Sequence, residues 1–371
     1  MEFIIKREEF LKCLLRTQGI IEKRNIKPIL ESVMIEVGNG KMNYRATDLE
    51  IGIVGSCDVD VISEGKITLL VSKAVEILKE LSEERVSVRQ KEDGNWIEIL
   101  CGKSLFNIAS MSPGGYPSLP AHDDIEFFSM DSKKIREMIR KTIYATSVDE
   151  TRYNLSGVFW ETEQNIIRMV ATDGHKLSMI EKETGEKDNL LIEKGAIFPK
   201  KGLNELRRIL EEDKETKEIL VGFKGNNGVF KTSELLIIMR LLDGEFPDYN
   251  LLLPKDNDKK FSINREVLLA SLKRVSLLSG GSSKLVKLFI SKGKIELTAR
   301  TPDYGEAFDE VELDYTGDDI EINFNARYFI ETLSVLDSKD VLFELRDPSN
   351  PVIVKPLNDD KHICVIMPVK V

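Results

Sequence analysis

The sequence predicts an α+β protein built from three similar domains, each with two helices packed on a mostly antiparallel sheet. Three observations support this prediction. Apolar patterns recur three times along the chain, alternating β-branched runs lie between the recurrences, and turn-rich segments close the first and second thirds. The length of 371 residues is greater than one domain usually needs, so it accommodates such a triplication.

The first recurring pattern places a Phe before apolar residues at positions +2, +7 and +11. The Phe and the apolar residue at +2 alternate as in a short strand. The apolar residues at +7 and +11 have helical spacing and follow a Lys, Asp or Asn that can start a helix. Each copy therefore predicts a strand followed by a helix. The three copies begin at Phe3, Phe128 and Phe261.

Two further patterns recur with the same period of about one third of the chain. One is a helical segment with an acidic residue at +6 and Leu at +11; the other is Ala-Thr-Asp, which is looser in its third copy. Agreement of three patterns on one period indicates a triplicated domain. The helical segments are residues 70–81, 199–210 and 325–336, and the Ala-Thr-Asp copies begin at Ala46, Ala171 and Ala299.

Alternating β-branched runs, broken by Gly, Asn and Asp turns, lie between the predicted helices and indicate antiparallel strands. Segments rich in Pro and Gly at 112–120 and 243–254 predict the domain boundaries. The predicted domains are residues 1–120, 121–254 and 255–371. The predicted strands are 32–37, 86–88, 96–99, 235–238, 287–290 and 294–297.

Composition excludes several classes of protein. A hydrophobic content of 42% with 31% charged residues is typical of a folded globular chain and argues against disorder. The chain has no apolar run of 18 residues, and its first residues lack the order of a signal peptide, so we expect a cytoplasmic protein without membrane contact. The cysteines lie far apart without metal-ligand spacing, which predicts buried thiols; they are Cys13, Cys57, Cys101 and Cys364.

Motifs for catalysis or cofactor binding are missing from the sequence. The three histidines have no metal-ligand spacing, and no phosphate-binding or nucleophile motif occurs, so we expect neither a metal nor a cofactor. Asp48, Asp173 and Asp303 could suggest a two-metal nuclease, but matching positions of separate domains would lie far apart. We predict instead that Asp48 and Asp173 form turns by accepting hydrogen bonds from nearby backbone amides.

Basic side chains concentrate on the predicted helices, although the net charge is −10. In the helix after Asp131, three cations occupy one face and an apolar stripe the opposite face, and the helix after Pro199 has the same arrangement. A basic helix face has two possible roles. It keeps the outer side of the helix hydrated, or it attracts the phosphate backbone of a nucleic acid without recognising the base sequence. The recurrence in three repeats favours nucleic acid. The cations are Lys133, Arg136, Arg140, Lys201 and Arg208, which we predict to face solvent.

Several longer motifs resemble one family. They are residues 152–161, 171–177, 199–202, 242–249 with Leu253 and Pro254, and 365–371; the first third matches mainly through residues 47–50. Together these stretches are similar to the bacterial DNA polymerase III beta subunit, the replicative sliding clamp. The resemblance spans the whole chain.

The resemblance implies a clamp fold in which each chain forms half of a six-domain ring, closed head to tail by two copies, with helices lining the hole. Such a ring encircles double-stranded DNA without sequence preference, slides along it and tethers the replicative polymerase. By the same resemblance it is not an enzyme, and a separate ATP-driven clamp loader opens it. The implied partners are a second copy, DNA, the polymerase, the loader and other clamp-binding proteins.

The resemblance also implies a groove between the middle and last domains that binds short apolar peptide segments. Taken alone, Leu155, Leu177 and Val365 would be read as core residues, and only the family match places them in a groove. An apolar surface containing Met adapts to varied ligands. The implied groove residues are Leu155, Thr172, Gly174, His175, Lys176, Leu177, Pro247, Leu252, Val365, Met367 and Pro368.

Two further sites follow from the same resemblance. Arg24 and Tyr153 match positions that touch DNA in the family, although Asp149 and Asn154 depart from the family pattern beside them. The implied subunit interface is apolar and consists of Phe106, Ile108, Leu277 and Leu278. Two other functions remain as alternatives: a protein-binding scaffold that has lost its DNA function, and a metal-dependent nuclease.

Overall fold

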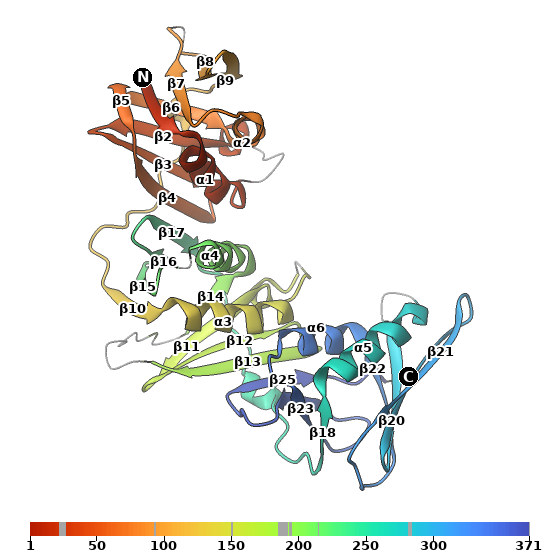
Figure 1. Cartoon of the computed structure of the whole chain (residues 1–371). Helices are drawn as coiled ribbons and strands as arrows, with labels where there is room; N and C mark the ends of the chain where they lie inside the picture. The colour runs from red at the N-terminus through yellow and green to blue at the C-terminus, as the bar shows by residue number, and fades with distance from the viewer. Residues whose placement is uncertain are drawn as a thin grey trace. The chain divides into compact units, whose positions relative to one another are not determined.

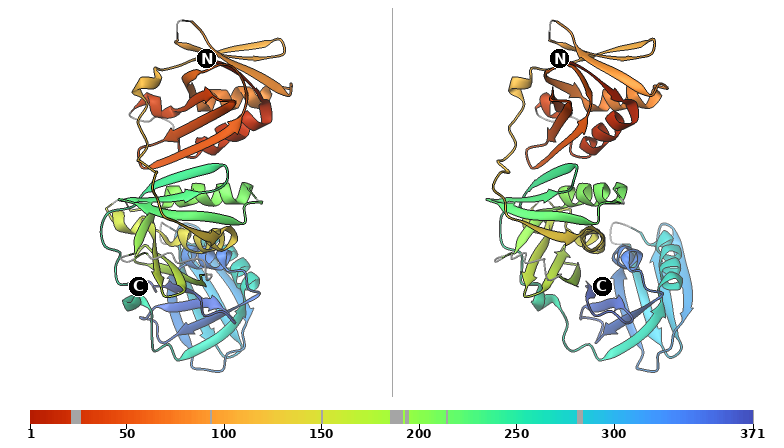
Figure 2. Two further views of the ribbon diagram at one scale, coloured as in Figure 1. Left: turned by 90° about the vertical axis from the view of Figure 1, so that its left-hand side faces the viewer. Right: turned by 60° about the vertical axis from the view of Figure 1, so that its left-hand side comes forward.

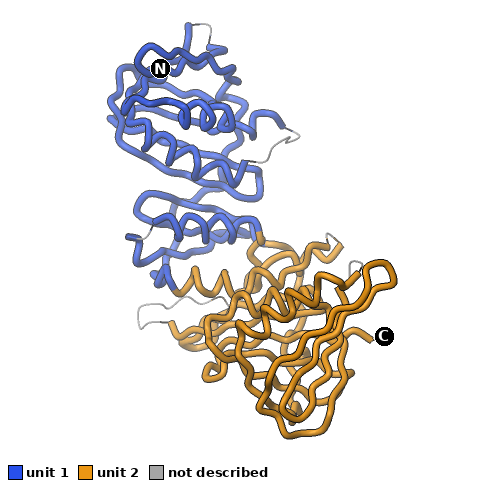
Figure 3. The backbone as a smooth tube through the Cα atoms, turned by 45° about the vertical axis from the view of Figure 1, so that its right-hand side comes forward, with its two compact units in different colours: residues 1–133, 201–241 blue, residues 134–200, 242–371 orange. Residues whose placement is uncertain are grey.

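The computed structural model describes residues 1–21, 27–92, 94–149, 151–184, 192, 195–213, 215–280 and 284–370. The chain is an α+β protein with antiparallel sheets, as the sequence predicts (Figure 1). It divides into two compact units (Figure 3). Unit 1 contains Met1–Lys133 and Lys201–Leu241, and unit 2 contains Lys134–Lys200 and Leu242–Val371.

Each third of the chain has the same order of elements: a strand, a helix, three strands, a further strand, a second helix and three strands, with one additional strand in the first third. This order confirms the predicted triplication. Helices and strands occur along the whole colour range of the ribbon (Figure 2). The first third contains β1 (Glu2–Lys6), α1 (Arg7–Gln18), β2 (Ser32–Gly38), β3 (Lys41–Thr47), β4 (Ile51–Asp58), the additional β5 (Asp60–Ser63), β6 (Gly65–Leu70), α2 (Val71–Glu80), β7 (Arg85–Gln90), β8 (Trp96–Cys101) and β9 (Ser104–Ala109).

The other two repeats follow the same order. The second contains β10 (Phe127–Asp131), α3 (Ser132–Thr142), β11 (Gly157–Glu163), β12 (Ile166–Thr172), β13 (Lys176–Glu183), β14 (Ala196–Pro199), α4 (Lys200–Glu212), β15 (Glu218–Lys224), β16 (Asn227–Lys231) and β17 (Leu235–Arg240). The third contains β18 (Lys259–Asn264), α5 (Arg265–Val275), β19 (Leu285–Ser291), β20 (Lys294–Thr301), β21 (Gly305–Glu312), β22 (Ile320–Asn325), α6 (Ala326–Val335), β23 (Asp340–Leu345), β24 (Val352–Pro356) and β25 (His362–Ile366). Short 3₁₀ turns are η1 (Pro28–Glu31), η2 (Pro113–Gly115), η3 (Ile143–Ala145), η4 (Tyr153–Leu155), η5 (Tyr249–Leu252) and η6 (Ser276–Leu278).

Strand pairing is also repeated. The strand before the first helix pairs with the strand after the second helix, as β1 with β7, β10 with β15, and β18 with β23. The strand that follows the first helix pairs with the strand that precedes the second, as β2 with β6, β11 with β14, and β19 with β22. Each repeat therefore contributes two groups of antiparallel strands.

Neighbouring repeats share sheets. In unit 1, β4 pairs with β17, which joins strands of the first and second repeats into one eight-stranded sheet, β10-β15-β16-β17-β4-β3-β2-β6. In unit 2, β13 pairs with β25 in the same way within the sheet β14-β11-β12-β13-β25-β24-β23-β18. The remaining sheets are β5-β1-β7-β8-β9 in unit 1 and β21-β20-β19-β22 in unit 2.

The helices bury the apolar stripes that the sequence predicts. In the third repeat, Leu268 of α5 and Phe329 of α6 belong to one core with side chains from both flanking sheets. Asn264 caps α5 by accepting a hydrogen bond from Val267 N–H at 3.1 Å. Among the described residues, no helix combines the length and the apolar character needed to cross a membrane.

Candidate functional site

A tight turn between β12 and β13 carries several residues of the predicted groove. The Asp173 Oδ1 atom accepts hydrogen bonds from the backbone N–H groups of His175 (2.8 Å) and Lys176 (2.9 Å). The Thr172 hydroxyl donates to the Lys176 carbonyl and accepts from Gly174 N–H. Gly174 has φ +86°, which glycine adopts without a steric penalty. The prediction that Asp173 is a turn former is confirmed.

The same turn occurs one repeat earlier, between β3 and β4. The Asp48 Oδ1 atom accepts from Glu50 N–H (3.0 Å) and Ile51 N–H (2.7 Å), and the Thr47 hydroxyl donates to the Ile51 carbonyl. Leu49 occupies the position of Gly174 and also has a positive φ of +84°. Matching hydrogen bonds at matching positions confirm the prediction for Asp48 and show that the two turns share one backbone design.

The turn at residues 172–176 adjoins the pairing of β13 with β25, where Leu177 lies opposite Val365. Both side chains are only 2% exposed and belong to one apolar cluster. Leu177 and Val365 form the floor of a pocket, and half-buried Leu252 and Met367 lie at its rim. Eight of the eleven predicted groove residues line one pocket here: Thr172, Gly174, His175, Lys176, Leu177, Leu252, Val365 and Met367.

The pocket is shallow, with a volume of only about 10 Å³. A ligand side chain must therefore displace part of the lining. Met367 is suited to such movement because its side chain is unbranched and adopts many shapes. The backbone N–H of Met367 donates to the His175 carbonyl at 2.8 Å, so the rim is anchored while its side chain can rearrange.

Three predicted groove residues lie outside this lining. Leu155 is 9% exposed at the end of η4, Pro247 is exposed in the linker, and Pro368 is half-buried after Met367. The cluster beneath the groove also contains residues that sequence reasoning did not assign to it. They are Val170, Met179, Tyr249 and Ile353, with partly buried Phe159, Phe246, Leu253 and Ile363 packed against them. Phe246, Tyr249 and Leu253 belong to the motif at residues 242–254 that carries the family resemblance, so the sequence offered a signal for including them in the groove.

Lys176 is a groove residue whose charge has another role. Its Nζ atom lies 2.6 Å from Glu331 and 3.4 Å from Asp173, and 4.7 Å from the centroid of the Tyr328 ring. The side chain is only 6% exposed. The Lys176 ammonium therefore holds β13 to α6 within unit 2, and it is not a free charge at the groove.

A larger polar pocket of about 400 Å³ shares His175 and Lys176 with the groove. The His175 ring stacks on Tyr328, with centroids 6.1 Å apart. Burial and the nearby Lys176 lower the pKa of Lys200, which also lines this pocket. The turn at 172–176 thus separates an apolar pocket from a charged one.

Three of the five helix cations do not simply face solvent, which corrects the prediction. Arg140 donates to the Val335 carbonyl at 3.1 Å and forms an ion pair with Asp337 at 2.5 Å. Its side chain is 32% exposed. Helical spacing identifies the outer face of the predicted helix, but it carries no information about a neighbouring repeat that covers this face.

The two predicted cations of α4 are likewise engaged within unit 1. Lys201 forms an ion pair with Asp48, and Arg208 forms ion pairs with Glu205 and Glu212 at 2.8 Å each. The Arg208 guanidinium also donates to two carbonyls of α1. These cations therefore hold the second repeat to the first, and each is 32% exposed.

Lys133 and Arg136 of α3 differ from these three. Lys133 is exposed and Arg136 is half-buried, and neither has an ion pair within the described part of the chain. Tyr153 is 48% exposed on η4. Arg24 lies outside the described residues.

The predicted interface residues lie on β9 and η6. Leu277 is 80% exposed and Leu278 is half-buried. On β9, Phe106 is half-buried, whereas Ile108 is only 6% exposed and belongs to the core of its own unit. Ile108 therefore has little surface to offer a second subunit, because strand alternation turns it inward.

Exposed apolar side chains near these residues were not predicted. Leu105 of β9 is 52% exposed. Phe308 of β21 is 61% exposed, and Tyr304 just before β21 is 73% exposed. The sequence did offer a signal for Leu105, because it lies beside Phe106 and near Ile108, which were already assigned to the interface.

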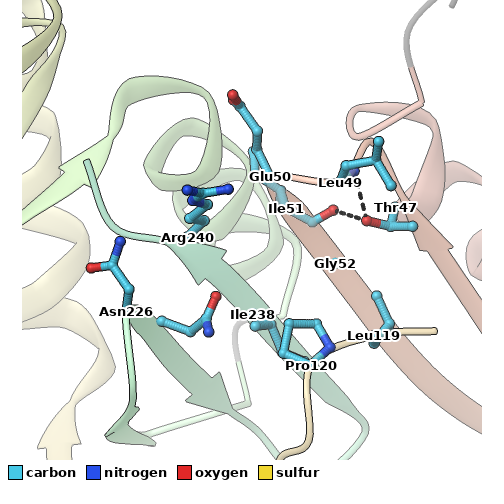
Figure 4. A pocket seen from close by; sticks show the side chains of 11 residues that line it. Thr47, Leu49, Glu50, Ile51, Gly52, Leu119, Pro120, Asn226, Ile238 and Arg240 are labelled. Atoms are coloured by element: carbon cyan, nitrogen blue, oxygen red, sulfur yellow. Dashed lines mark hydrogen bonds between the residues drawn. The ribbon is translucent and has the colours of Figure 1, made fainter. Parts of the chain in front are cut away.

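The join of β4 with β17 carries a pocket at the position that matches the groove (Figure 4). Gly52 lies opposite Ile238, as Leu177 lies opposite Val365. Arg240 N–H donates to the Glu50 carbonyl at 2.8 Å, as Met367 N–H donates to His175. This pocket has a volume of about 310 Å³, and Asn226, Asn227, Glu50 and Arg240 give it a polar lining.

Models of one family match all three thirds of the chain. The N-terminal, central and C-terminal domains of the DNA polymerase III beta subunit match residues 1–120, 129–248 and 250–370. Among curated relatives, the Beta sliding clamp of Caulobacter vibrioides is 32% identical over 378 residues, and that of Pseudomonas aeruginosa is 30% identical over 374 residues. Each alignment covers 100% of both chains.

Solved structures agree with these relatives. The crystal structure of the DNA polymerase III subunit beta from Pseudomonas aeruginosa is similar with a TM-score of 0.93 and 29% identity. The sliding clamp from Bartonella birtlesii bound to griselimycin has a TM-score of 0.93 and 30% identity. Both comparisons cover 100% of both chains. The chain therefore belongs to the DNA polymerase III beta subunit family and is a processivity factor of the sliding-clamp type.

Proposed function

We propose that two copies of the chain close head to tail into a non-catalytic ring, with domains at residues 1–120, 121–254 and 255–371 in each copy. The repeated sheet join supports this. The β4 strand pairs with β17, the last strand of the next repeat, and β13 pairs with β25 by the same rule. In the third repeat the strand that matches β4 and β13 is β21, and in the first repeat the strand that matches β17 and β25 is β9. Neither has such a partner within the chain, and each is the edge strand of a sheet among the described residues. In the ring, β21 of one copy pairs with β9 of the other.

Side chains at these two edges favour the same junction. Leu105 on β9, Phe308 on β21 and Leu277 on η6 are each more than half exposed. An exposed edge strand with apolar side chains is a template for further pairing unless it is covered. A ring of two copies covers both edges twice and leaves neither open.

The groove formed by Leu177, Val365, Leu252 and Met367 is proposed to bind short apolar peptide segments of the replicative polymerase, the clamp loader and other clamp-binding proteins. The observation that carries this proposal is the apolar floor, in which Leu177 and Val365 lie opposite each other on adjacent strands. The flexible Met367 at the rim lets one site accept different sequences. The relatives from Pseudomonas aeruginosa and Bartonella birtlesii have been solved with griselimycin, which supplies a probe for this chain.

We assign the DNA contact of the ring to Lys133 and Arg136 on α3, with Tyr153 on η4, and not to the cations engaged between repeats. Lys133 is exposed, Arg136 is half-buried and Tyr153 is 48% exposed, so each has surface available for contact with phosphates. Arg140, Lys201 and Arg208 contribute mainly to holding repeats together, because each already has partners. The acidic side chains that a nuclease would need are engaged similarly, since Asp48 and Asp173 bind their own turns.

The ring is tested by the solution mass over a dilution series, measured by light scattering. We expect a species of twice the 42.1 kDa chain mass. Phe308→Asp places a charge at the proposed junction and should give the single-chain mass. Leu357→Asp, at an exposed apolar position away from β21, is the control and should remain dimeric. A wild-type monomer at micromolar concentration, or a dimeric Phe308→Asp variant, would contradict the junction.

A further inference from the structure

Two cysteines of unit 1 lie side by side although 44 positions separate them in the sequence. The Cys13 Sγ atom on α1 is 3.7 Å from the Cys57 Sγ atom on β4. Both are free thiols. A disulfide has an S–S distance of about 2.05 Å, so the pair needs an approach of less than 2 Å to form one.

A pocket of about 390 Å³ is lined by both cysteines. Cys57 is half-buried and Cys13 is 4% exposed. A small molecule can therefore reach the pair through the pocket, although both thiols are largely covered by neighbouring side chains. The other pocket-lining residues are Glu9, Lys12, Arg16, Lys41, Ser56, Asp58, Ser233 and Glu234.

The surroundings distinguish the two thiols. The hydrogen bond with Cys57, the Tyr44 hydroxyl and the positive charges of Arg16 and Lys12 hold the pKa of Cys13 below its ordinary value, against the effect of burial. The hydrogen bond to Cys13 and burial raise the pKa of Cys57. Of the two thiols, Cys13 therefore loses its proton more readily than Cys57, and a thiolate is the form that reacts with peroxides.

The other two cysteines lack this arrangement. Cys101 is 3% exposed and, within the described chain, makes no contact with a second thiol like that of Cys13 with Cys57. Cys364 is fully buried, and burial raises its pKa to about 11. Both therefore serve as internal references for nonspecific oxidation.

We propose that Cys13 and Cys57 form an oxidation site that a hydroperoxide converts into an intramolecular disulfide. The Cys13 thiolate attacks one peroxide oxygen, the O–O bond breaks, and Cys13 becomes a sulfenic acid as hydroxide leaves and takes up a proton. The Cys57 sulfur then attacks the Cys13 sulfur, and the sulfenic oxygen leaves as water with the Cys57 proton. Overall, two thiols and one hydrogen peroxide give one disulfide and two waters.

The position of the bond gives it a structural consequence. The disulfide would tie α1 to β4, the strand that joins the first repeat to β17 of the second. Arg16, one turn after Cys13, binds Glu234 at 2.7 Å and is itself 5% exposed on its side chain. Oxidation would thus fix α1 beside the contact between these repeats, and a small thiol reductant would release it.

The test is treatment of the folded full-length protein with hydrogen peroxide, followed by intact mass measurement and peptide mapping. We expect a loss of about 2 Da, the mass of two hydrogens, and a single cross-linked peptide pair containing Cys13 and Cys57. Dithiothreitol should reverse both changes. In Cys57→Ser the sulfenic acid at Cys13 has no resolving thiol, so dimedone should trap it there.

Cys101→Ser is the matched control and should form the disulfide at the wild-type rate. No cross-link in the folded protein would overturn the proposal. Oxidation of Cys101 and Cys364 at the same rate as Cys13 would also overturn it, because the neighbouring Cys57 thiol would then not increase the reactivity of Cys13. Irreversible oxidation of Cys13 with Cys57 present would also contradict it, since Cys57 would then fail to resolve the intermediate.

Discussion

The two sheet joins of the molecule have the same backbone and different side chains. At both, a Thr-Asp turn with identical hydrogen bonds leads into a strand that pairs with the last strand of the next repeat. At the groove, however, the matching positions hold Leu177, Val365 and Met367, whereas the join of β4 with β17 holds Gly52, Ile238 and Arg240.

This difference separates what the backbone provides from what the side chains provide. The backbone provides a concave position beside each turn, and the larger pocket is at the join of β4 with β17. A Cβ atom on Gly52 would lie 2.6 Å from Leu119, so the linker occupies the space that Leu177 takes at the groove. We therefore propose that an apolar floor, rather than a large volume, marks the peptide site.

The largest expected effect comes from transferring the side chains of one join to the other. Leu177→Gly with Met367→Arg should weaken griselimycin binding by about 100-fold, because two apolar anchors of roughly 1.5 kcal/mol each are removed. Isothermal titration calorimetry measures this effect. The reciprocal control, Arg240→Met, should leave the affinity unchanged. Unaltered binding by the double variant would disprove the groove assignment.

Acidification should weaken one join more than the other. Burial and the nearby Lys141 charge lower the pKa of His362, on β25, to about 3. An unfolded histidine has a pKa of about 6.5, so the unfolded chain takes up the proton first, and stability is lost as the pH falls from about 6.5 toward 3. The expected loss at pH 5 is roughly 2 kcal/mol.

His362→Leu provides the matched control, because Leu235 holds the corresponding position on β17. Hydrogen exchange at pH 5 and 7 should show β25 loosening with acid in the wild type and not in the variant. Equal loosening of β17 and β25 in the wild type would contradict a role for His362.

The turn aspartates should have equal structural and unequal functional effects. Asp173→Ala and Asp48→Ala each leave two backbone N–H groups without their acceptor, so each should cost about 1–2 kcal/mol of the free energy of unfolding. Urea denaturation measures this cost. Asp173→Ala alone should also weaken griselimycin binding. Weakened binding in Asp48→Ala would mean that the effect reflects general destabilisation.

The smallest effect concerns backbone conformation. Gly174→Ala should cost about 1 kcal/mol, since a Cβ is disfavoured at this φ and would lie 2.9 Å from Arg152 Nη1. Leu49→Gly should change stability by less than about 0.5 kcal/mol, because relief of strain is offset by the greater freedom of an unfolded glycine. Thermal unfolding compares the two. Similar losses in both would argue against equivalent turns.

Much of this comparison was predictable from the sequence because it depends on local patterns. The triplicated order of elements and the turns at Asp48 and Asp173 follow from residue spacing and side-chain chemistry. The groove lining required the family resemblance, since Leu177 and Val365 are indistinguishable from core residues by burial pattern alone.

Features that depend on contacts between repeats were not predictable. The helical period places Arg140, Lys201 and Arg208 on an outer face, yet each binds a neighbouring element. The ion pair of Lys176 with Glu331 spans 155 positions, and no local pattern signals it. The adjacency of Cys13 and Cys57 depends in the same way on how α1 packs on β4.

Hydrogen exchange of the full-length chain with and without griselimycin tests the central claim most directly, because it reports on both joins in one experiment. The account predicts protection of the turn at 172–176 and of strand β25 through Met367, with no change at 47–52 or along β17. Protection at the join of β4 with β17, or no protection at either join, would contradict the claim that side chains alone make one join the binding site.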